Sequence, residues 1–446
     1  MIDSLKAYIS MMENENQILA IKEKVFREDI PELIEKLSDA RKLLLFEKVD
    51  GYSCKLVANL VPSHDVFRKI FGGVDNPYEF FLKGIKKVEK KVYSSERKLK
   101  SIGMQGKNLM DFLPILKHYE KDSAPYITTG IVSSLDPESG IVGRGIHRME
   151  YRGKNHMGVA LLNPPLTNIY EKYRAKQERM PISVIIGVDP VIFISMALKV
   201  TPETDKLEVA GGLKGKGVEV ISSFDSAIDV PAGGEYYLEG YIDPRKGKQD
   251  GPLGEISGYY LTLKETPTIV VERLSHRDSP IYHALLPTSL EADMYLTFVS
   301  RAHIEENAKK LFPFIAMITF IQKTFGSSLV VNVKTIERHK IRNLILFLLS
   351  FPMIKKVVII DEDVNPEDLK DVEWALVTRC QADEDVIIMK HLQGQPIDPQ
   401  AEGGHGVTKI GINATIQGKS IAERAKVVKG NRKSIEKIIR SVGGGG

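Results

Sequence analysis

The chain has 446 residues, of which 43% are hydrophobic and 27% are charged. This composition is typical of a soluble globular protein, and the length exceeds what one hydrophobic core usually serves, so we expect two or three domains. The 62 basic and 58 acidic residues leave a net charge of only +4. Because no basic stripe interleaved with aromatic residues occurs, the sequence does not favour a nucleic-acid partner.

Cysteine use and hydropathy bear on the compartment. Cys54 and Cys380 are far apart in the sequence and neither lies in a CxxC pair, so neither a disulfide framework nor a structural zinc site is expected. The N-terminus lacks a signal-peptide pattern, and the apolar run at residues 344–352 has about half the length that a membrane span needs. We therefore predict a cytoplasmic protein with no membrane partner.

Residues 1–115 are predicted to form an N-terminal α/β region. Helical periodicity covers residues 3–14 and 30–41, and residues 42–47 form the apolar run of a buried strand. The stretch 84–100 is rich in Lys and Glu, and we expect a solvated helix or connector there.

Residues 116–305 are predicted to form a central β-rich domain. Short strand-like runs are separated by turns rich in Gly, Pro, Asp and Lys, and one helical stretch at 168–176 interrupts them. This spacing predicts a barrel or a strongly bent sheet. The predicted strands are 127–132, 158–162, 182–186, 218–221, 236–241, 259–263 and 268–274.

Residues 306–446 are predicted to form a C-terminal α/β domain. Strands rich in Val and Ile alternate with helices, which is typical of a mostly parallel sheet with crossover helices. The chain as a whole is thus predicted to be mixed α/β (α+β). The predicted elements are strands 328–333, 356–360 and 385–389, helices 341–349 and 366–378, and a helix at 433–440 before four terminal glycines.

The run Asp250-Gly-Pro-Leu-Gly-Glu255 sets two carboxylates around a stiff segment. Pro252 fixes its own φ, while Gly251 and Gly254 allow backbone conformations closed to other residues. Two acids on a tight loop between strand-like segments suit proton transfer, because one can raise the pKa of the other. The alternative is a surface turn with two solvated acids, and the spacing alone favours it.

A second run, Gly143-Arg-Gly-Ile-His-Arg148, also lies between strand-like segments. A Gly-X-Gly turn that leads into a strand can place the Arg148 guanidinium beside a carboxylate or a phosphate. The alternative is a half-buried ion pair that only stabilises the barrel.

Both runs resemble those of the UbiD-type decarboxylases, which use prenylated FMN to remove CO2 from α,β-unsaturated or aromatic acids. In that family an Arg follows an Asn-X-Gly-X-(Tyr/His) turn, and two acids lie in a Glu-Gly-Pro-Phe-Gly-Glu turn. Arg148, Asp250 and Glu255 occupy the corresponding positions, with Asp in place of the first Glu. The likeness continues at residues 5–9, 43–51, 186–190, 209–215, 235–240, 275–283, 361–365, 374–379 and 409–415.

The resemblance implies an architecture and partners. It implies an N-terminal α/β segment, a central split β-barrel that binds the flavin, and a C-terminal α/β domain used in oligomerisation, as a homo-oligomer (dimer or hexamer). It also implies a flavin prenyltransferase that supplies the cofactor. The sequence has no Walker A, GxGxxG, HExxH or Gly-X-Ser-X-Gly pattern. A flavin phosphate held by backbone amides and loop side chains needs none of them.

The resemblance also implies three catalytic roles. Arg148 would bind the substrate carboxylate or orient Glu255. Glu255 would donate a proton after CO2 leaves, which requires a carboxylic acid with a raised pKa. Asp250 would couple to Arg148, although its side chain, one methylene shorter than that of Glu, needs a backbone adjustment to reach the same point.

Three departures concern a divalent metal, which in the family is held by an Asn, a His and a Glu and bridges to the flavin phosphate. Here the Asn position is Gly143, no His is available at 162–167, and the Glu position is Lys206. A charged Lys does not coordinate a metal but can neutralise a phosphate directly. We therefore expect no metal, with Lys206 as the counter-charge; the alternative is a site that no longer binds the prenylated flavin.

Further contacts to the flavin are assigned by the same resemblance. They are Gly145, Ile146 and His147 beside Arg148, Ser195 and Met196 in the loop that wraps the phosphate, and Lys334 as a phosphate ligand.

Other polar residues are weaker candidates. His276 and His283 are predicted to be structural, since their spacing suits no metal site. His405, in a Gly-rich loop, either caps the site on closure or belongs to a plain turn. Four basic residues near the second run suit either a phosphorylated substrate or a solvated surface: Arg144, Arg152, Lys154 and Arg174.

The predicted function is that of a non-oxidative carboxy-lyase with prenylated FMN as electron sink. The substrate would be a small carboxylic acid, either an aromatic acid of quinone synthesis or an unsaturated phosphorylated acid such as anhydromevalonate phosphate. Two alternatives stay open: a UbiD-like flavin-binding or partner subunit without decarboxylase activity, and a protein that binds unmodified FMN for other chemistry.

Overall fold

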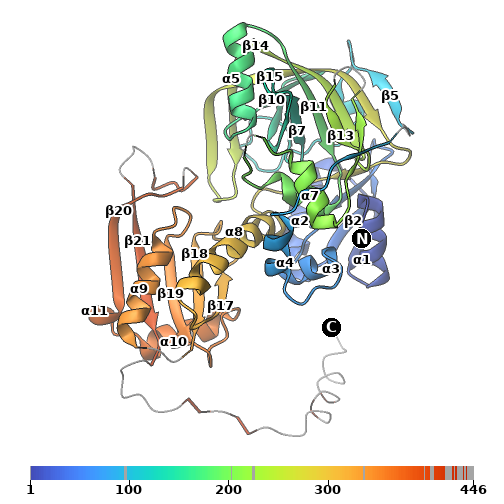
Figure 1. The fold of residues 1–446 in the computed structure, drawn as a ribbon. Helices are drawn as coiled ribbons and strands as arrows, with labels where there is room; N and C mark the ends of the chain where they lie inside the picture. Colours follow the sequence, from blue (N-terminus) through green and yellow to red (C-terminus); the bar gives the residue numbers. More distant parts are fainter. Residues whose placement is uncertain are drawn as a thin grey trace.

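The described residues of this computed structural model are 2–416 without 95–97, 202, 224–226, 335–336, 396 and 402–405, together with 424, 425, 427, 428, 435 and 438. His405 and nearly all of the predicted helix at 433–440 lie outside them. The described residues form four sheets, and helix α8 (Leu290–Leu311) runs between the C-terminal sheet and the rest of the chain (Figure 1). This is the mixed α/β architecture that the sequence predicts.

The N-terminal sheet has the strand order β1-β2-β3-β16. In helix α1, Ser4 accepts a hydrogen bond from the amide of Ala7, and buried Leu5, Tyr8 and Met12 follow the helical period. The last strand, β16, comes from far along the chain and ties the N-terminal sheet to the central region. The elements are α1 (Leu5–Asn14), β1 (Ile18–Val25), η1 (Arg27–Asp29), α2 (Ile30–Leu37), η2 (Ser38–Ala40), β2 (Leu43–Val49), β3 (Lys55–Ala58), α3 (His64–Ile70), α4 (Pro77–Gly84) and β16 (Ile281–His283).

A nine-stranded central sheet follows the order β6-β9-β10-β15-β14-β11-β7-β8, with β5 added beside β15. Its longest strands, β14 and β15, are paired along 19 and 17 residues with several register shifts. They absorb three of the shorter strands predicted from the sequence. The elements are β5 (Lys100–Gly103), η3 (Leu109–Asp111), β6 (Tyr126–Ile127), β7 (Ile131–Leu135), β8 (Val142–Ile146), β9 (Met149–Tyr151), β10 (His156–Val159), α5 (Leu166–Lys176), β11 (Met180–Ile186), β14 (Tyr236–Gly254) and β15 (Tyr260–His276).

The central sheet is strongly curled. Strand β8 is the last in the strand order and β9 is the second, yet only residues 147 and 148 separate them in the chain. Three Cα–Cα steps span at most about 11 Å, so the two ends of the sheet must approach each other. This satisfies the prediction of a split barrel.

Two buried helices and a small sheet lie beside the curled sheet. Helix α6 (Pro190–Met196) is buried along its whole length, and α7 (Lys206–Lys214) packs against it. The small sheet has the order β13-β12-β4 and recruits β4 from the stretch predicted to be a helix or connector. Its strands are β4 (Val92–Tyr93), β12 (Glu219–Ser222) and β13 (Asp229–Pro231).

The C-terminal sheet has the order β17-β18-β19-β21-β20. Its three central strands are parallel, and an antiparallel strand flanks them on each side. The predicted strands 328–333 and 356–360 are two of the parallel strands, but the predicted strand 385–389 is the antiparallel edge strand β20, and the third parallel strand, β21, was not predicted. Among the described residues, no helix is long and apolar enough to cross a membrane. The elements are β17 (Ile315–Phe320), β18 (Ser328–Val333), α9 (Arg338–Leu349), β19 (Lys356–Asp361), α10 (Leu369–Arg379), α11 (Ala382–Asp385), β20 (Val386–Leu392) and β21 (Val407–Ala414).

Candidate active site

Arg148 lies at the joint where the curled sheet closes. It belongs to the two-residue link between β8 and β9, and its carbonyl accepts a hydrogen bond of 3.2 Å from the amide of Ala160 beyond β10. Its side chain is only 9% exposed. The closure of the sheet therefore fixes the position of a buried guanidinium.

The two acids of the Asp250–Glu255 run are brought to one face by a β-bulge. Asp250 pairs with Leu263 and Leu253 with Leu261, so β14 has one more residue than β15 at this point. In a regular strand, side chains five positions apart point to opposite faces, and one extra residue restores them to the same face. Gly251 has φ +97°, and a Cβ there would lie 2.5 Å from the carbonyl oxygen of Leu261.

The position of the turn differs from the sequence prediction. The Gly-Pro-Leu-Gly segment is the irregular end of β14, and the chain reverses after it, between Glu255 and Tyr259. The amide of Glu255 donates to the Tyr259 carbonyl at 2.9 Å, which closes the hairpin. The prediction placed the turn at Gly251 and Gly254 because these glycines signal irregular backbone, which here is the bulge.

Arg148 bridges the two acids. Its Nε and Nη2 donate to Asp250 Oδ1 at 3.1 and 2.6 Å, and its Nη1 donates to Glu255 Oε1. The side chain of Asp250 is fully buried, whereas that of Glu255 is 22% exposed. One cation thus serves two carboxylates, and the group carries a net charge of −1 when both are ionised.

The electrostatics of this group favour a proton on Asp250. Burial raises the pKa of Asp250 despite the neighbouring Arg148, and Glu150 raises it further. Asp250 Oδ2 is buried and has no hydrogen-bond partner among the described residues. A buried carboxylate oxygen without a partner is unfavourable, so this atom is suited to hold a proton or to accept a hydrogen bond from a ligand.

A second layer of polar residues holds the bulge in place. Glu150 Oε1 accepts from the amide of Gly251 at 3.3 Å, and Asp122 Oδ1 accepts from the amide of Gly254 at 2.9 Å. Tyr126 and Ser123 also donate to Glu150, at 3.0 and 2.6 Å. These residues belong to no motif in the sequence; only the position of Glu150, two after Arg148, is a signal.

Three of the predicted cofactor contacts lie directly before Arg148. A Cβ at Gly145 would lie 2.7 Å from Nε2 of His147, so a larger residue would displace the imidazole. Nδ1 of His147 is 2.8 Å from the Ala160 carbonyl, and burial lowers the pKa of His147 to about 4. His147 is therefore neutral, with Nδ1 donating and Nε2 left as an acceptor. Ile146 is partly buried against the core.

Lys206, Met196 and Ser195 form a second group. Lys206 is the first residue of α7, is 6% exposed, and donates from Nζ to the Met196 carbonyl at 2.7 Å. Ser195 Oγ donates to the Val191 carbonyl at 2.7 Å, so its hydroxyl is used within α6. The charge of Lys206 also contributes to the lowered pKa of His147, after the larger effect of burial.

Lys206 is a buried cation without an acidic partner. Among the described residues no carboxylate lies within ion-pair distance of its Nζ, and burial lowers its pKa to about 8. A buried ammonium that lacks a counter-charge is unfavourable in the empty protein and favours an anionic ligand.

The remaining predicted cations are placed elsewhere or are already paired. Lys334 is exposed at the end of β18 in the C-terminal sheet, where its amide donates to the Phe314 carbonyl at 2.9 Å. Arg144 and Arg152 are engaged in ion pairs with Asp205 and Glu150, so they are not free to bind a phosphorylated substrate. Arg174 is exposed and pairs with Glu171, and Lys154 is exposed.

The positions of the family's metal ligands do not supply a donor set. A Cβ at Gly143 would lie 2.4 Å from Cδ1 of Ile169 and 3.1 Å from Cγ of Pro165, so apolar side chains occupy the space of an Asn. Lys206 offers an ammonium rather than a carboxylate. In the described part of the chain, no group of three or more His, Cys, Asp or Glu side chains gathers to hold a metal.

The two histidines near β16 do not meet. Nδ1 of His276 is 2.8 Å from the Arg277 carbonyl, whereas Nε2 of His283 is 2.9 Å from Oε1 of buried Glu291. The ring of His283 also packs edge-on against Phe193 of α6.

A cavity of about 230 Å³ lies beyond the hairpin turn that follows Glu255. Buried Asp293, one helical turn beyond Leu290 on the same face of α8, has no ion-pair partner among the described residues. Burial raises the pKa of Asp293 to about 6, and the backbone amide of Lys323 only partly opposes this rise. No motif in the sequence marks this residue. The cavity is lined by Ile34, Glu35, Ser38, Ile256, Ser257, Gly258, Leu286, Thr288, Ser289, Leu290 and Lys323.

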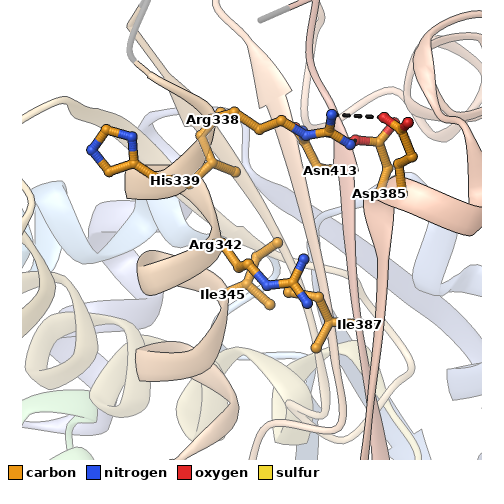
Figure 2. A pocket seen from close by; sticks show the side chains of 9 residues that line it. Arg338, His339, Arg342, Ile345, Asp385, Ile387 and Asn413 are labelled. Carbon is orange, nitrogen blue, oxygen red and sulfur yellow. Dashed lines mark hydrogen bonds and ion pairs between the residues drawn. The ribbon is translucent and has the colours of Figure 1, made fainter. Parts of the chain in front are cut away.

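Another cavity, of about 350 Å³, lies in the C-terminal domain (Figure 2). Arg338 pairs there with Glu384 and Asp385 at 2.7 and 3.0 Å, and Asn413 donates to Asp385 at 3.1 Å. None of the predicted site residues lines this cavity.

Two family models match the chain. The model for the 3-octaprenyl-4-hydroxybenzoate carboxy-lyase Rift-related domain (UbiD) matches residues 90–290, and the model for the C-terminal domain of the same carboxy-lyase matches residues 293–414. The first match contains Arg148, Asp250, Glu255 and Lys206.

Individual relatives agree with the family models. The chain is 31% identical over 382 residues to the anhydromevalonate phosphate decarboxylase of Methanosarcina mazei, covering 83% of this chain and 87% of that one. It is 26% identical to the phenolic acid decarboxylase of Bacillus subtilis, covering 92% of both. The structure of a UbiD-class enzyme from Pelotomaculum thermopropionicum in complex with FMN matches with a TM-score of 0.87 and 26% identity, covering 96% of this chain and 97% of that one.

Proposed function

We propose that this chain, which belongs to the UbiD family of carboxy-lyases, removes CO2 from an α,β-unsaturated or aromatic carboxylic acid with prenylated FMN as cofactor. The observation that carries the proposal is the buried Arg148 that bridges Asp250 and Glu255 at the joint of the split barrel. A guanidinium that faces two acids is able to exchange one of them for a substrate carboxylate.

The residues present fit a flavin phosphate. Lys206 would neutralise it, since its buried ammonium has a carbonyl but, among the described residues, no carboxylate as partner. The neutral His147 could not donate to the phosphate through Nε2, but it would accept a hydrogen bond there from an N–H or O–H group elsewhere on the flavin. Gly145 keeps the space beside His147 open. When bound, the prenylated flavin supplies the electron sink for the pair released from the broken carbon–carbon bond.

The chain's own residues would bind the substrate and move one proton. Arg148 would hold the substrate carboxylate, which leaves as CO2. Glu255 would then donate its proton to the carbon that lost CO2, so that a C–H bond replaces the C–C bond. Because Glu255 is 22% exposed, it can regain a proton from solvent, while buried Asp250 keeps Arg148 in place.

The relatives name two substrate classes for the first tests. The Methanosarcina mazei protein acts on anhydromevalonate phosphate, and the Bacillus subtilis protein acts on phenolic acids. Both are conjugated carboxylic acids that suit Arg148 at the carboxylate end.

Assembly and cofactor supply belong to the same proposal. One structural relative is described as an evolved dimeric form with prenylated FMN, and it is 24% identical to this chain. We propose that this chain also forms a homo-oligomer, dimer or hexamer, and that it receives its cofactor from a flavin prenyltransferase.

The test is production of the protein together with a flavin prenyltransferase, followed by ultraviolet–visible spectroscopy, mass spectrometry of the extracted cofactor, and measurement of CO2 release from each acid. We expect a bound modified flavin and CO2 release that Arg148→Met abolishes. A bound modified flavin without CO2 release from any acid of either class would favour the partner-subunit alternative. Unmodified FMN as the only occupant would favour other chemistry.

A further inference from the structure

A buried ion network surrounds Asp205, the residue directly before Lys206. Arg144, which is fully buried, donates from Nε and Nη2 to the two carboxylate oxygens of Asp205 at 2.8 and 3.1 Å. Its Nη1 donates to the Asp229 carbonyl at 2.6 Å and to Ser133 Oγ at 3.1 Å. Every nitrogen of this guanidinium thus has a partner.

Lys91 joins Asp205 to Asp229. Its Nζ donates to Asp205 Oδ2 and to Asp229 Oδ2, both at 2.9 Å, and Tyr93 also donates to Asp229 Oδ2 at 2.7 Å. Among the described residues the network holds two cations, Arg144 and Lys91, and two carboxylates, Asp205 and Asp229, so their charges sum to zero (2 − 2). The charge of the neighbouring Lys206 therefore has no counterpart in it.

Asp205 is directed away from Lys206. Its Oδ1 accepts from the amide of Leu207 at 3.0 Å and so caps the N-terminus of α7. Although burial acts against ionisation, Arg144 holds the pKa of Asp205 at about 2. Arg144 and Lys91 occupy both carboxylate oxygens of Asp205, so this ionised acid is engaged before it can serve the neighbouring ammonium of Lys206.

The partner of Lys206 is fixed by a second buried pair. Lys214, at the end of α7, donates to Asp189 Oδ2 at 2.8 Å, and Asp189 Oδ1 caps α6 through the amide of Val191 at 3.0 Å. Helix α6 ends at Met196, whose carbonyl accepts from Lys206. Helices α6 and α7 are therefore joined twice, by Lys206 and Met196 at one end and by Lys214 and Asp189 at the other. These contacts set the position of the Lys206 ammonium.

We infer that Arg144 and Lys91 are positioning residues that hold Asp205 away from Lys206, so that the charge of Lys206 stays available for the phosphate of the flavin. The inference rests on the proposed role of Lys206 and assigns to Arg144 a task different from phosphate or substrate contact. It predicts that removal of Arg144 weakens flavin binding only as long as residue 205 is an acid.

The experiment measures the affinity of the cofactor-free protein for FMN by quenching of flavin fluorescence, with thermal unfolding as a check on folding. The variants are Arg144→Met, Asp205→Asn, the double variant with both changes, and Lys206→Met. Asn still caps a helix but carries no charge. Arg379→Met is the control, because Arg379 is a buried arginine that pairs with Asp361 and Asp363 in the C-terminal domain.

We expect Arg144→Met to weaken FMN binding by about tenfold or more, which corresponds to about 1.4 kcal/mol. Asp205→Asn and the double variant should bind FMN within about threefold of the original protein, even where their thermal stability falls. Arg379→Met should leave FMN affinity unchanged.

The outcomes separate the two proposals. If Lys206→Met binds FMN as well as the original protein, the proposed role of Lys206 is wrong. If Lys206→Met weakens binding but the double variant binds no better than Arg144→Met, the role of Lys206 stands and Arg144 is only structural. If Arg144→Met does not fold, a loss of FMN affinity in folded Asp205→Asn overturns the inference by itself.

Discussion

Arg144 and Arg148 lie four residues apart in the same segment and both bind acids, yet their surroundings differ: Arg144 is fully buried and the side chain of Arg148 is 9% exposed. Arg144 belongs to a neutral network in which each guanidinium nitrogen has a partner. Arg148 faces two carboxylates, of which Asp250 has an oxygen without a partner and Glu255 is partly exposed. A balanced cluster stabilises the fold, whereas one with an excess acid and an access path to solvent is suited to exchange a proton or a ligand.

The most decisive test of this difference is at the exposed acid of the Arg148 cluster. We expect Glu255→Gln to lower turnover by a factor of about 10² or more, because an amide cannot donate the proton that the reaction needs. Cofactor content should stay unchanged. If turnover equals that of the original protein, Glu255 takes no part in the reaction. The Arg148 cluster would then, like the Arg144 cluster, only stabilise the fold.

The next test concerns the cation that neither cluster neutralises. Lys206→Met should weaken FMN binding at least tenfold and should raise the free energy of unfolding of the cofactor-free protein by about 1–3 kcal/mol, because a buried charge is removed. Because the pKa of Lys206 is about 8, FMN affinity of the original protein should fall as the pH rises above this value. Lys206→Arg, which stays charged, should show no such decline.

A backbone test addresses the bulge that joins the two acids to Arg148. Gly251→Ala should destabilise the protein by about 2 kcal/mol, since φ is +97° and the new Cβ would meet the Leu261 carbonyl. Turnover should fall as well, because the side chains of Asp250 and Glu255 would lose their common face. Gly258→Ala is the control. Gly258 lies in the following turn at φ +82°, and no atom lies within 4 Å of the position of its Cβ. The backbone strain without a steric clash should lower stability less than Gly251→Ala does.

Asp293 tests the effect of burying a carboxylate that has no ion-pair partner among the described residues. Its folded pKa of about 6 lies above the ordinary value of 3.8, so the folded state binds more protons between these values. Stability from this group is therefore present at low pH and is lost as the pH rises through about 6. Asp293→Asn should raise stability at pH 8 by about 1–2 kcal/mol and should have no effect near pH 4. An equal effect at both pH values would contradict this account.

The smallest expected effect is at Arg174. This side chain is 57% exposed and pairs with Glu171. Arg174→Gln should change the free energy of unfolding by less than about 0.5 kcal/mol and should not alter turnover, because exposed ion pairs contribute little. A large loss of turnover would show that the outer basic residues do take part in substrate binding.

Much of the architecture follows from local patterns in the sequence. The predicted strands 328–333 and 356–360 form β18 and β19 with α9 between them, and the run at 42–47 forms β2. The third parallel strand, β21, follows a Gly-rich stretch that reads as a tail, so the sequence does not predict it. The length of the β14–β15 hairpin could not be predicted, because Gly247, Gly251 and Pro252 read as turn residues but lie within a bulged strand. The pairing of β16 with β3 depends on contacts between distant segments and leaves no local signal.

For the candidate site, the resemblance supplied residue types, and the structure supplied their partners. Arg148, Asp250 and Glu255 were named from two runs of sequence, and they do meet. The sequence leaves Arg144 open between a contact to a phosphorylated substrate and a solvated surface, because it does not show that Asp205 lies opposite Arg144. Asp293 belongs to no motif, and only its burial and raised pKa distinguish it.

The two-residue link between β8 and β9 limits how this protein can be altered. A single residue inserted at 147–148 would move the guanidinium of Arg148 away from Asp250. It would also lengthen the link that holds the two ends of the curled sheet together. Circular permutants with new termini in loop tips elsewhere should fold and keep their activity. A permutant with its termini at 147–148 should still form the strands but should lose decarboxylase activity. The shortest connection in the central sheet is thus the segment in which changes of chain length are least permissible.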